Sequence, residues 1–170
     1  METTSAVIRG GLPGAGASIR VDPWAPLMRR GVHVSEPSVA VGIRQSLPKE
    51  RSLRGGSVAL SWTAGHLRLC PLRVAIDAVV EVAPCAEANA GVLRASARGF
   101  ADARELSTFW FDVGGSIWAS MSLSDAVFLS ATVLLTMPLF RQPIALASGA
   151  TVASVPPLGL LGGLGVGIRF

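Results

Sequence analysis

The chain of 170 residues has little charge and no tyrosine. Asp, Glu, Lys and Arg make up 15% of it, and hydrophobic residues make up 50%. The basic residues, which give a net charge of +4, are scattered along the chain, so we do not expect nucleic-acid binding. The two cysteines and two histidines have no zinc-like spacing, so we expect no metal site.

Signatures of catalysis are also missing. The glycine-rich runs at residues 10–14 and 162–167 lack the Lys-Ser/Thr that completes a phosphate-binding loop. No spacing of Ser, His and Asp residues selects a catalytic group. We therefore expect no enzyme activity and no cofactor.

The sequence has no long, uninterrupted apolar run. Residues 117–140 contain Asp125 and Pro138, and residues 143–168 contain two adjacent prolines and many glycines, so neither segment is typical of a membrane helix. The first nine residues lack the basic segment and apolar core of an export signal. Either an export signal was removed, or the start is assigned too late, or an outer-membrane barrel is the wrong interpretation.

What the sequence does have is alternation of apolar residues. From residue 158 to residue 170 every second residue is apolar except Gly162, and most residues between them are glycine. Because successive side chains of a strand point to opposite faces, this period of two predicts a strand with one apolar and one nearly bare face. Such a strand suits a small transmembrane β-barrel, which has lipid outside and a crowded interior.

The same alternation recurs along the chain, in the segments 39–43, 57–70, 80–92, 109–122 and 126–140. Two less regular segments, 15–21 and 28–34, bring the expected strand number to about eight. Long and short connections alternate, as they do in membrane barrels. We therefore predict an all-β, up-and-down antiparallel transmembrane β-barrel. It is expected to be a single domain over residues 1–170, with residues 1–35 partly irregular.

The two cysteines are placed to face each other across a hairpin. If the chain turns at residues 77–78, Cys70 and Cys85 lie equally far from the turn. Both cysteines point inward if a bulge near Gly65 shifts the alternation by one residue. The apolar residues before the bulge, such as Val58, and those after it, such as Leu67, would then all face outward. A disulfide would then fix the hairpin register. The alternative is two free, buried thiols.

Polar residues fall on the face that is expected to point inward. They are Arg44, Arg68, Glu87, Asn89, Asp112 and Arg169. Charges inside a narrow barrel need partners because little water is available there, so we expect a network of ion pairs and hydrogen bonds. A conducting or ligand-holding interior is the alternative. Aromatic residues near strand ends predict girdles at the membrane interfaces, with ordinary sheet packing as the alternative. They are Trp24, Trp62, Trp110, Trp118, Phe109, Phe111, Phe140 and Phe170, of which parity places Trp110 and Trp118 inside.

A resemblance to a known family is carried by the segments 67–71 (LRLCP), 83–86 (APCA) leading to 90–94 (AGVLR), and 165–170 (GVGIRF). Over residues 55–170 the chain resembles small eight-stranded outer-membrane barrels of Gram-negative bacteria, and more narrowly uncharacterised barrel proteins of myxobacteria. The resemblance implies a bacterial outer-membrane location, contact with outer-membrane lipid, and assembly by the barrel-assembly machinery. Leu164, Val166, Ile168 and Phe170 are similar to the C-terminal signal that this machinery reads.

The expected function is a structural or surface-interaction role in the outer membrane, with an interior filled by side chains and no catalysis. Three alternatives stay open. One is a helical membrane subunit of an organelle complex, with spans at 117–140 and 144–168. Another is a soluble β-barrel that binds a small apolar ligand, and the last is a reading frame that is never translated.

Overall fold

In a computed structural model, all the regular structure within the described residues of the protein consists of β-strands. The structure describes residues 2–4, 11–22, 33–35, 37–53, 56–76, 79–99, 105–140, 144–145, 151–153 and 156–169. The strands are β1 (Glu2–Thr4), β2 (Leu12–Val21), β3 (His33–Ser35), β4 (Ser38–Ser46), β5 (Lys49–Leu53), β6 (Gly56–Cys70), β7 (Arg73–Ala75), β8 (Val80–Arg98), β9 (Glu105–Ser122), β10 (Val127–Pro138), β11 (Ile144–Ala145), β12 (Thr151–Ala153) and β13 (Gly159–Ile168).

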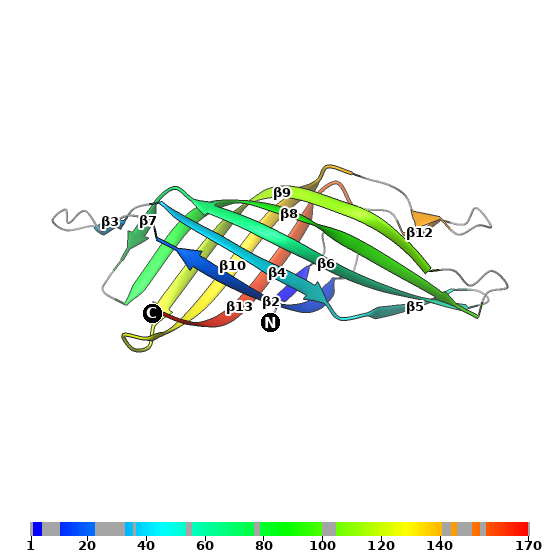
Figure 1. Ribbon diagram of the computed structural model, residues 1–170, viewed down its shortest axis with the longest axis horizontal. Coiled ribbons are helices and arrows are strands. Elements are labelled where there is room, and N and C mark those ends of the chain that lie inside the picture. The colour runs from blue at the N-terminus through cyan, green and yellow to red at the C-terminus, as the bar shows by residue number, and fades with distance from the viewer. Residues whose placement is uncertain are drawn as a thin grey trace.

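Eleven of these strands form one sheet, in the order β3-β7-β8-β9-β10-β13-β1-β2-β4-β6-β5, and β8 also pairs with β6. All pairings in it are antiparallel. Strands β11 and β12 form a separate two-stranded pair among the described residues. Figure 1 shows the long strands inclined to the long axis and curled around an interior. The prediction of an all-β, antiparallel fold is thus confirmed.

The helical alternative finds no support in the described part of the chain. No helix there is long and apolar enough to cross a membrane. The stretches 117–140 and 144–168, proposed as helical spans, contribute instead to β9, β10, β11, β12 and β13 where they are described.

Strand β6 shows how alternation builds the sheet, and it corrects one expectation. Every even residue from Val58 to Cys70 is buried. Its pairing with β8 runs without a register shift from Ser57 to Leu69, so the predicted bulge near Gly65 is wrong. Val58 points inward because the interior around it is itself apolar. The alternation along β6 therefore keeps the same inward positions throughout, and no bulge is needed.

The interior near β5 and β12, which we call the loop end, is filled by apolar side chains. This apolar plug consists of Leu12, Val58, Leu60, Trp62, Ala64, Leu93, Ala95, Ala97, Trp110, Leu134 and Leu161. The three described tryptophans, Trp62, Trp110 and Trp118, are only 2–3% exposed. A girdle of Trp62 at the membrane interface is therefore wrong, whereas the inward parity of Trp110 and Trp118 is confirmed. Trp24 and Phe170 lie outside the described residues.

The outer face of the sheet carries exposed apolar side chains. Ile117 and Val133, which are paired across β9 and β10, are 53% and 56% exposed. On β13 the outward residues Leu164, Val166 and Ile168 are 62–72% exposed. The alternating segments therefore place their apolar faces outward over the middle of the sheet.

The N-terminal part differs from its prediction. The expected strand at 15–21 is present as part of β2, but β2 pairs directly with β4, so no strand from 28–34 lies between them. Of that segment, β3 includes His33 and Val34 and pairs with β7, while residues 28–32 lie outside the described residues. The place beside β13 is taken by β1 instead. Its sequence, Glu-Thr-Thr, has no apolar alternation and gave no strand signal.

Candidate functional site

Polar and charged side chains form a buried layer next to the apolar plug. This polar layer consists of Arg44, His66, Arg68, Glu87, Asn89, Asp112 and Ser116, each at most 7% exposed. Strand register brings them to one level, because His66 pairs with Asn89, Arg68 with Glu87, and Asn89 with Asp112. Five of the six predicted interior residues therefore lie together, which leaves only Arg169 apart.

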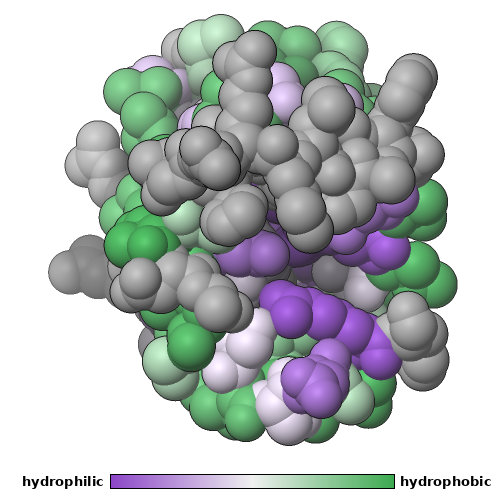
Figure 2. Space-filling model, turned by 90° about the vertical axis from the view of Figure 1, so that its left-hand side faces the viewer, coloured by the Kyte–Doolittle hydropathy of each residue, from purple (hydrophilic) through white to green (hydrophobic). Residues whose placement is uncertain are grey.

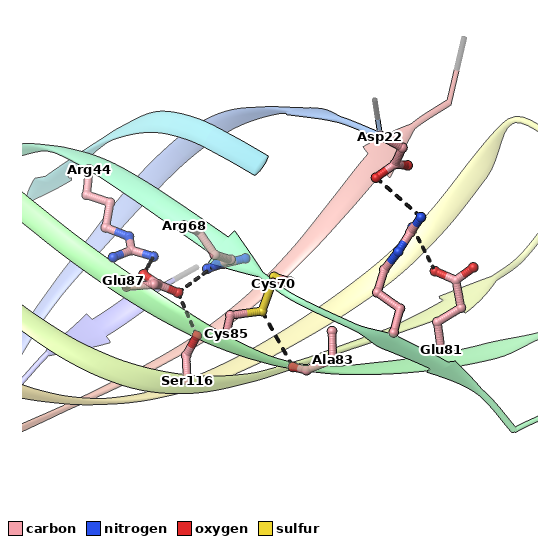
Figure 3. Close-up of a disulfide and its surroundings, with 10 residues drawn as sticks. Asp22, Arg44, Arg68, Cys70, Glu81, Ala83, Cys85, Glu87 and Ser116 are labelled. Atoms are coloured by element: carbon pink, nitrogen blue, oxygen red, sulfur yellow. Dashed lines mark hydrogen bonds and ion pairs between the residues drawn. A yellow bond between two sulfur atoms is a disulfide. The ribbon is translucent and has the colours of Figure 1, made fainter. Parts of the chain in front are cut away.

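Glu87 is the centre of the polar layer. Arg44 Nη2 donates to Oε2 at 2.9 Å, and Arg68 Nε donates to Oε1 at 2.5 Å. Ser116 Oγ also donates to Oε1, at 2.9 Å. The carboxylate is fully buried, so its two arginine partners replace the water that would otherwise solvate it. Figure 3 shows the three donors converging on it from β4, β6 and β9.

A chain of hydrogen bonds extends the layer toward the apolar plug. Arg44 Nη1 donates to Asn89 Oδ1 at 2.8 Å, and Asn89 Nδ2 donates to Asp112 Oδ1 at 2.6 Å. Trp110 Nε1 donates to Asp112 Oδ2 at 2.5 Å. The amide of Asn89 thus accepts from a cation and donates to a carboxylate, which fixes its orientation. Trp110 contributes its ring to the apolar plug and its N–H to the polar layer.

A disulfide lies on the other side of the polar layer. Cys70 and Cys85 are bonded, as the equal spacing from the turn predicts, and so they are not free thiols. They form a small cluster with Ala83 and Trp118. Figure 3 also marks the contact of 3.6 Å between Cys85 Sγ and the Ala83 carbonyl oxygen. A bridged sulfur has no hydrogen to donate, so we regard this as a packing contact.

A cavity of about 910 Å³ opens at the end of the molecule that lies opposite the apolar plug. We call this end the turn end, and we call the opening of the cavity its mouth. Its charged lining residues are Arg20, Asp22, Arg44, Arg68, Arg73, Glu81 and Arg169. Figure 2 looks onto this end: hydrophilic residues lie toward the hollow centre and hydrophobic residues lie around the rim where the described residues are visible. Arginines outnumber the carboxylates, so the cavity favours anionic groups.

The arginines at the mouth are held by rings and carboxylates. Arg20 stacks on Trp118, with its Cζ atom 3.5 Å from the ring centroid. Arg73 lies 3.3 Å from Asp22 and 3.7 Å from a Glu81 oxygen. Arg169 is exposed, and its Nη1 donates to Ser122 Oγ at 2.9 Å. This residue therefore belongs to the mouth and not to the buried layer.

The sequence analysis did not name several residues of this site. His66 and Ser116 were available from the parity of β6 and β9, whereas Arg20 depended on a strand that the sequence defined poorly. Among the described residues, no three His, Cys, Asp or Glu side chains gather to hold a metal ion. Comparison with known proteins found no matching family model, curated protein or solved structure.

Proposed function

We propose that the chain is a small β-barrel that spans a membrane, with a structural or surface-interaction role and no catalysis. The observation that carries the proposal is the inverted placement of charge and apolar surface. Glu87 on β8 and Asp112 on β9 are at most 3% exposed, whereas Val133 on β10, the strand that pairs with β9, is 56% exposed. In water, apolar surface of this extent is unfavourable. In hydrocarbon it is favourable, and a polar interior costs little if its members are paired.

The pairing pattern supports closure of the sheet into a barrel. The pairings β6-β8-β9-β10-β13-β1-β2-β4 lead back to β6, with β1 joining β13 to β2 over Glu2–Thr4. Closing a sheet on itself removes open edges, whose backbone groups would lack partners in lipid. An eight-stranded barrel also has an interior that side chains can fill, as the apolar plug and the polar layer do. The outer-membrane location and the lipid and assembly-machinery partners rest on the family resemblance.

Labels on the outer face test the proposal. Cysteine is introduced at Ile117 or Val133, with the native disulfide intact, and carries a spin label in protein refolded into phospholipid vesicles. Ser124, in the exposed turn between β9 and β10, serves as the control position. We expect molecular oxygen, which concentrates in hydrocarbon, to broaden the spectra of the labels at residues 117 and 133. We expect a water-soluble nickel reagent to broaden the spectrum of the label at residue 124.

Gel migration without and with boiling gives a second readout. A closed barrel resists detergent in the cold and shifts on heating, so we expect two positions on the gel. A single position, together with nickel access to Ile117 and Val133 equal to that of Ser124, would exclude a membrane barrel.

A further inference from the structure

Arg20 is a cation of the cavity that has no carboxylate of its own. It reaches from β2 to β9, where its Cζ atom lies 3.5 Å from the centroid of the Trp118 ring. Within the described residues it forms no ion pair, and Asp22, the carboxylate next to it on the inner face of β2, contacts Arg73 instead. Its Nε atom is buried and has no hydrogen-bond partner there. An aromatic ring attracts a cation but does not neutralise it, so the charge of Arg20 acts within the cavity.

Arg68 brings a second guanidinium group to the same space. Strand register places Arg20, Ala40 and Arg68 in one row across β2, β4 and β6, and Arg68 lies close enough to Arg20 to repel it. In the part of the chain that is described, Arg68 donates only through Nε, to a Glu87 carboxylate that it shares with another arginine. Figure 3 shows Arg68 on the side of Glu87 that faces the mouth. Its two Nη atoms are therefore left to bind something else.

His66 is the third polar group of this wall, and it lacks a partner. It pairs with Gly42, and a Cβ atom at Gly42 would lie 2.5 Å from His66 Cε1, so the ring lies over β4. The side chain lines the cavity and is 7% exposed, yet its Nδ1 atom has no hydrogen-bond partner among the described residues. A buried polar atom without a partner is unfavourable, so a bound molecule that supplies one gains affinity.

We propose that the cavity binds a phosphate group between Arg20 and Arg68, beside His66. A phosphate ester carries about −1.5 to −2 charges near neutral pH and has three acceptor oxygens, so it pairs with both guanidinium groups at once and relieves their repulsion. A carboxylate has only two oxygens, which a single guanidinium group can occupy through two parallel hydrogen bonds. The cavity volume of about 910 Å³ also accommodates an organic group attached to the phosphate. The inference does not depend on the membrane proposal, because these residues all line the interior.

Titration calorimetry on the full chain, in micelles of a neutral detergent, tests this assignment. The probe is glycerol 3-phosphate, and the control is glycerate, which has a carboxylate in place of the phosphate. We expect glycerol 3-phosphate to bind at least about tenfold more tightly than glycerate.

A pair of arginine variants separates a specific site from general positive charge. Arg20→Gln should weaken the binding of glycerol 3-phosphate by at least about tenfold, because it removes one of the two cations that contact the phosphate. Arg169→Gln is the matched control: Arg169 lines the same cavity and the substitution removes the same charge, but its guanidinium group lies at the mouth over Phe128. We expect this variant to change the affinity by less than about twofold.

A second pair of variants keeps the test valid if Arg20→Gln does not fold. Ser18 is the inward residue before Arg20 on β2 and also lines the cavity. Ser18→Asp attaches a carboxylate beside the guanidinium groups, so it should compete with the phosphate and weaken binding by at least about tenfold. Ser18→Asn has nearly the same shape without the charge, and it should bind glycerol 3-phosphate like the parent protein.

Phosphatidic acid, which presents a phosphate monoester as a lipid head group, identifies the source of the phosphate. Displacement of glycerol 3-phosphate by phosphatidic acid added to the micelles assigns the site to a lipid head group, and a lack of displacement assigns it to a soluble ester. The proposal is overturned if neither phosphate compound binds, or if glycerate binds as tightly as glycerol 3-phosphate. It is also overturned if Arg169→Gln weakens binding as much as Arg20→Gln, or if Ser18→Asp and Ser18→Asn bind alike.

Discussion

At the residue scale, the polar layer depends on the charge of Glu87. Glu87→Gln keeps the shape of the side chain but removes the negative charge that both Arg44 and Arg68 contact. Removing one partner of a buried ion pair costs about 3–5 kcal/mol, so we expect a loss of that order in the free energy of unfolding. Urea titration of the protein refolded in vesicles measures it.

The matched control is Glu50→Gln. Glu50 lies 4.0 Å from Arg98, and both side chains are more than half exposed, so the pair contributes little. We expect this variant to unfold like the parent protein. Equal losses in the two variants would show that the buried charge has no special role.

Two adjacent glycines give a second prediction at the residue scale. A Cβ atom at Gly114 would lie 2.0 Å from the Leu135 carbonyl oxygen, whereas a Cβ at Gly115 would meet nothing within 4 Å. Gly114→Ala should therefore lower the free energy of unfolding by about 1–3 kcal/mol, because the sheet must shift to accept it. Gly115→Ala should leave it unchanged or raise it slightly. The same titration decides, and a loss in Gly115→Ala equal to that in Gly114→Ala contradicts the prediction.

At the element scale, the disulfide fixes the register of β6 against β8. Its cysteines are 15 residues apart in sequence, and closing a loop of that length stabilises a fold by about 3 kcal/mol. We expect reduction to lower the free energy of unfolding by this order. The Cys70→Ala/Cys85→Ala double variant should be equally destabilised and insensitive to reductant. A parent protein that is insensitive to reductant would contradict this prediction.

Strand parity explains what the sequence could predict and what it could not. Strong alternation in β8 and β9 identified Glu87, Asn89 and Asp112 as inward residues, and these are the centre of the site. The same reasoning failed in β6, because it assumed that an apolar face always points outward. Val58 and its apolar neighbours point inward instead, since the interior changes from apolar to polar along its length. No local pattern records that change.

Strand β1 shows a second limit of sequence patterns. Its three residues have no apolar alternation, and its place between β13 and β2 is fixed by long-range pairing.

At the scale of the whole molecule, the outer face should tolerate charge poorly at its middle. Val133→Arg places a cation where we expect the centre of the bilayer, which costs about 2–4 kcal/mol in a membrane barrel. Leu123→Arg, in the β9–β10 turn, should have no such cost. Urea titration in vesicles compares the two variants. A neutral Val133→Arg would indicate that the outer face is in contact with water.

The apolar plug blocks the interior at one end, so that the cavity is a dead-end pocket and not a channel. The cavity is open at the turn end, but at the loop end its axis runs into closely packed Leu, Val, Ala and Trp side chains. An ion that entered would have to shed its hydration to go further, which is prohibitively unfavourable in such a medium. Within the part of the chain that the structure describes, we therefore expect no passage for ions through the plug, and a bilayer that holds this protein should be no leakier to salts than one without it.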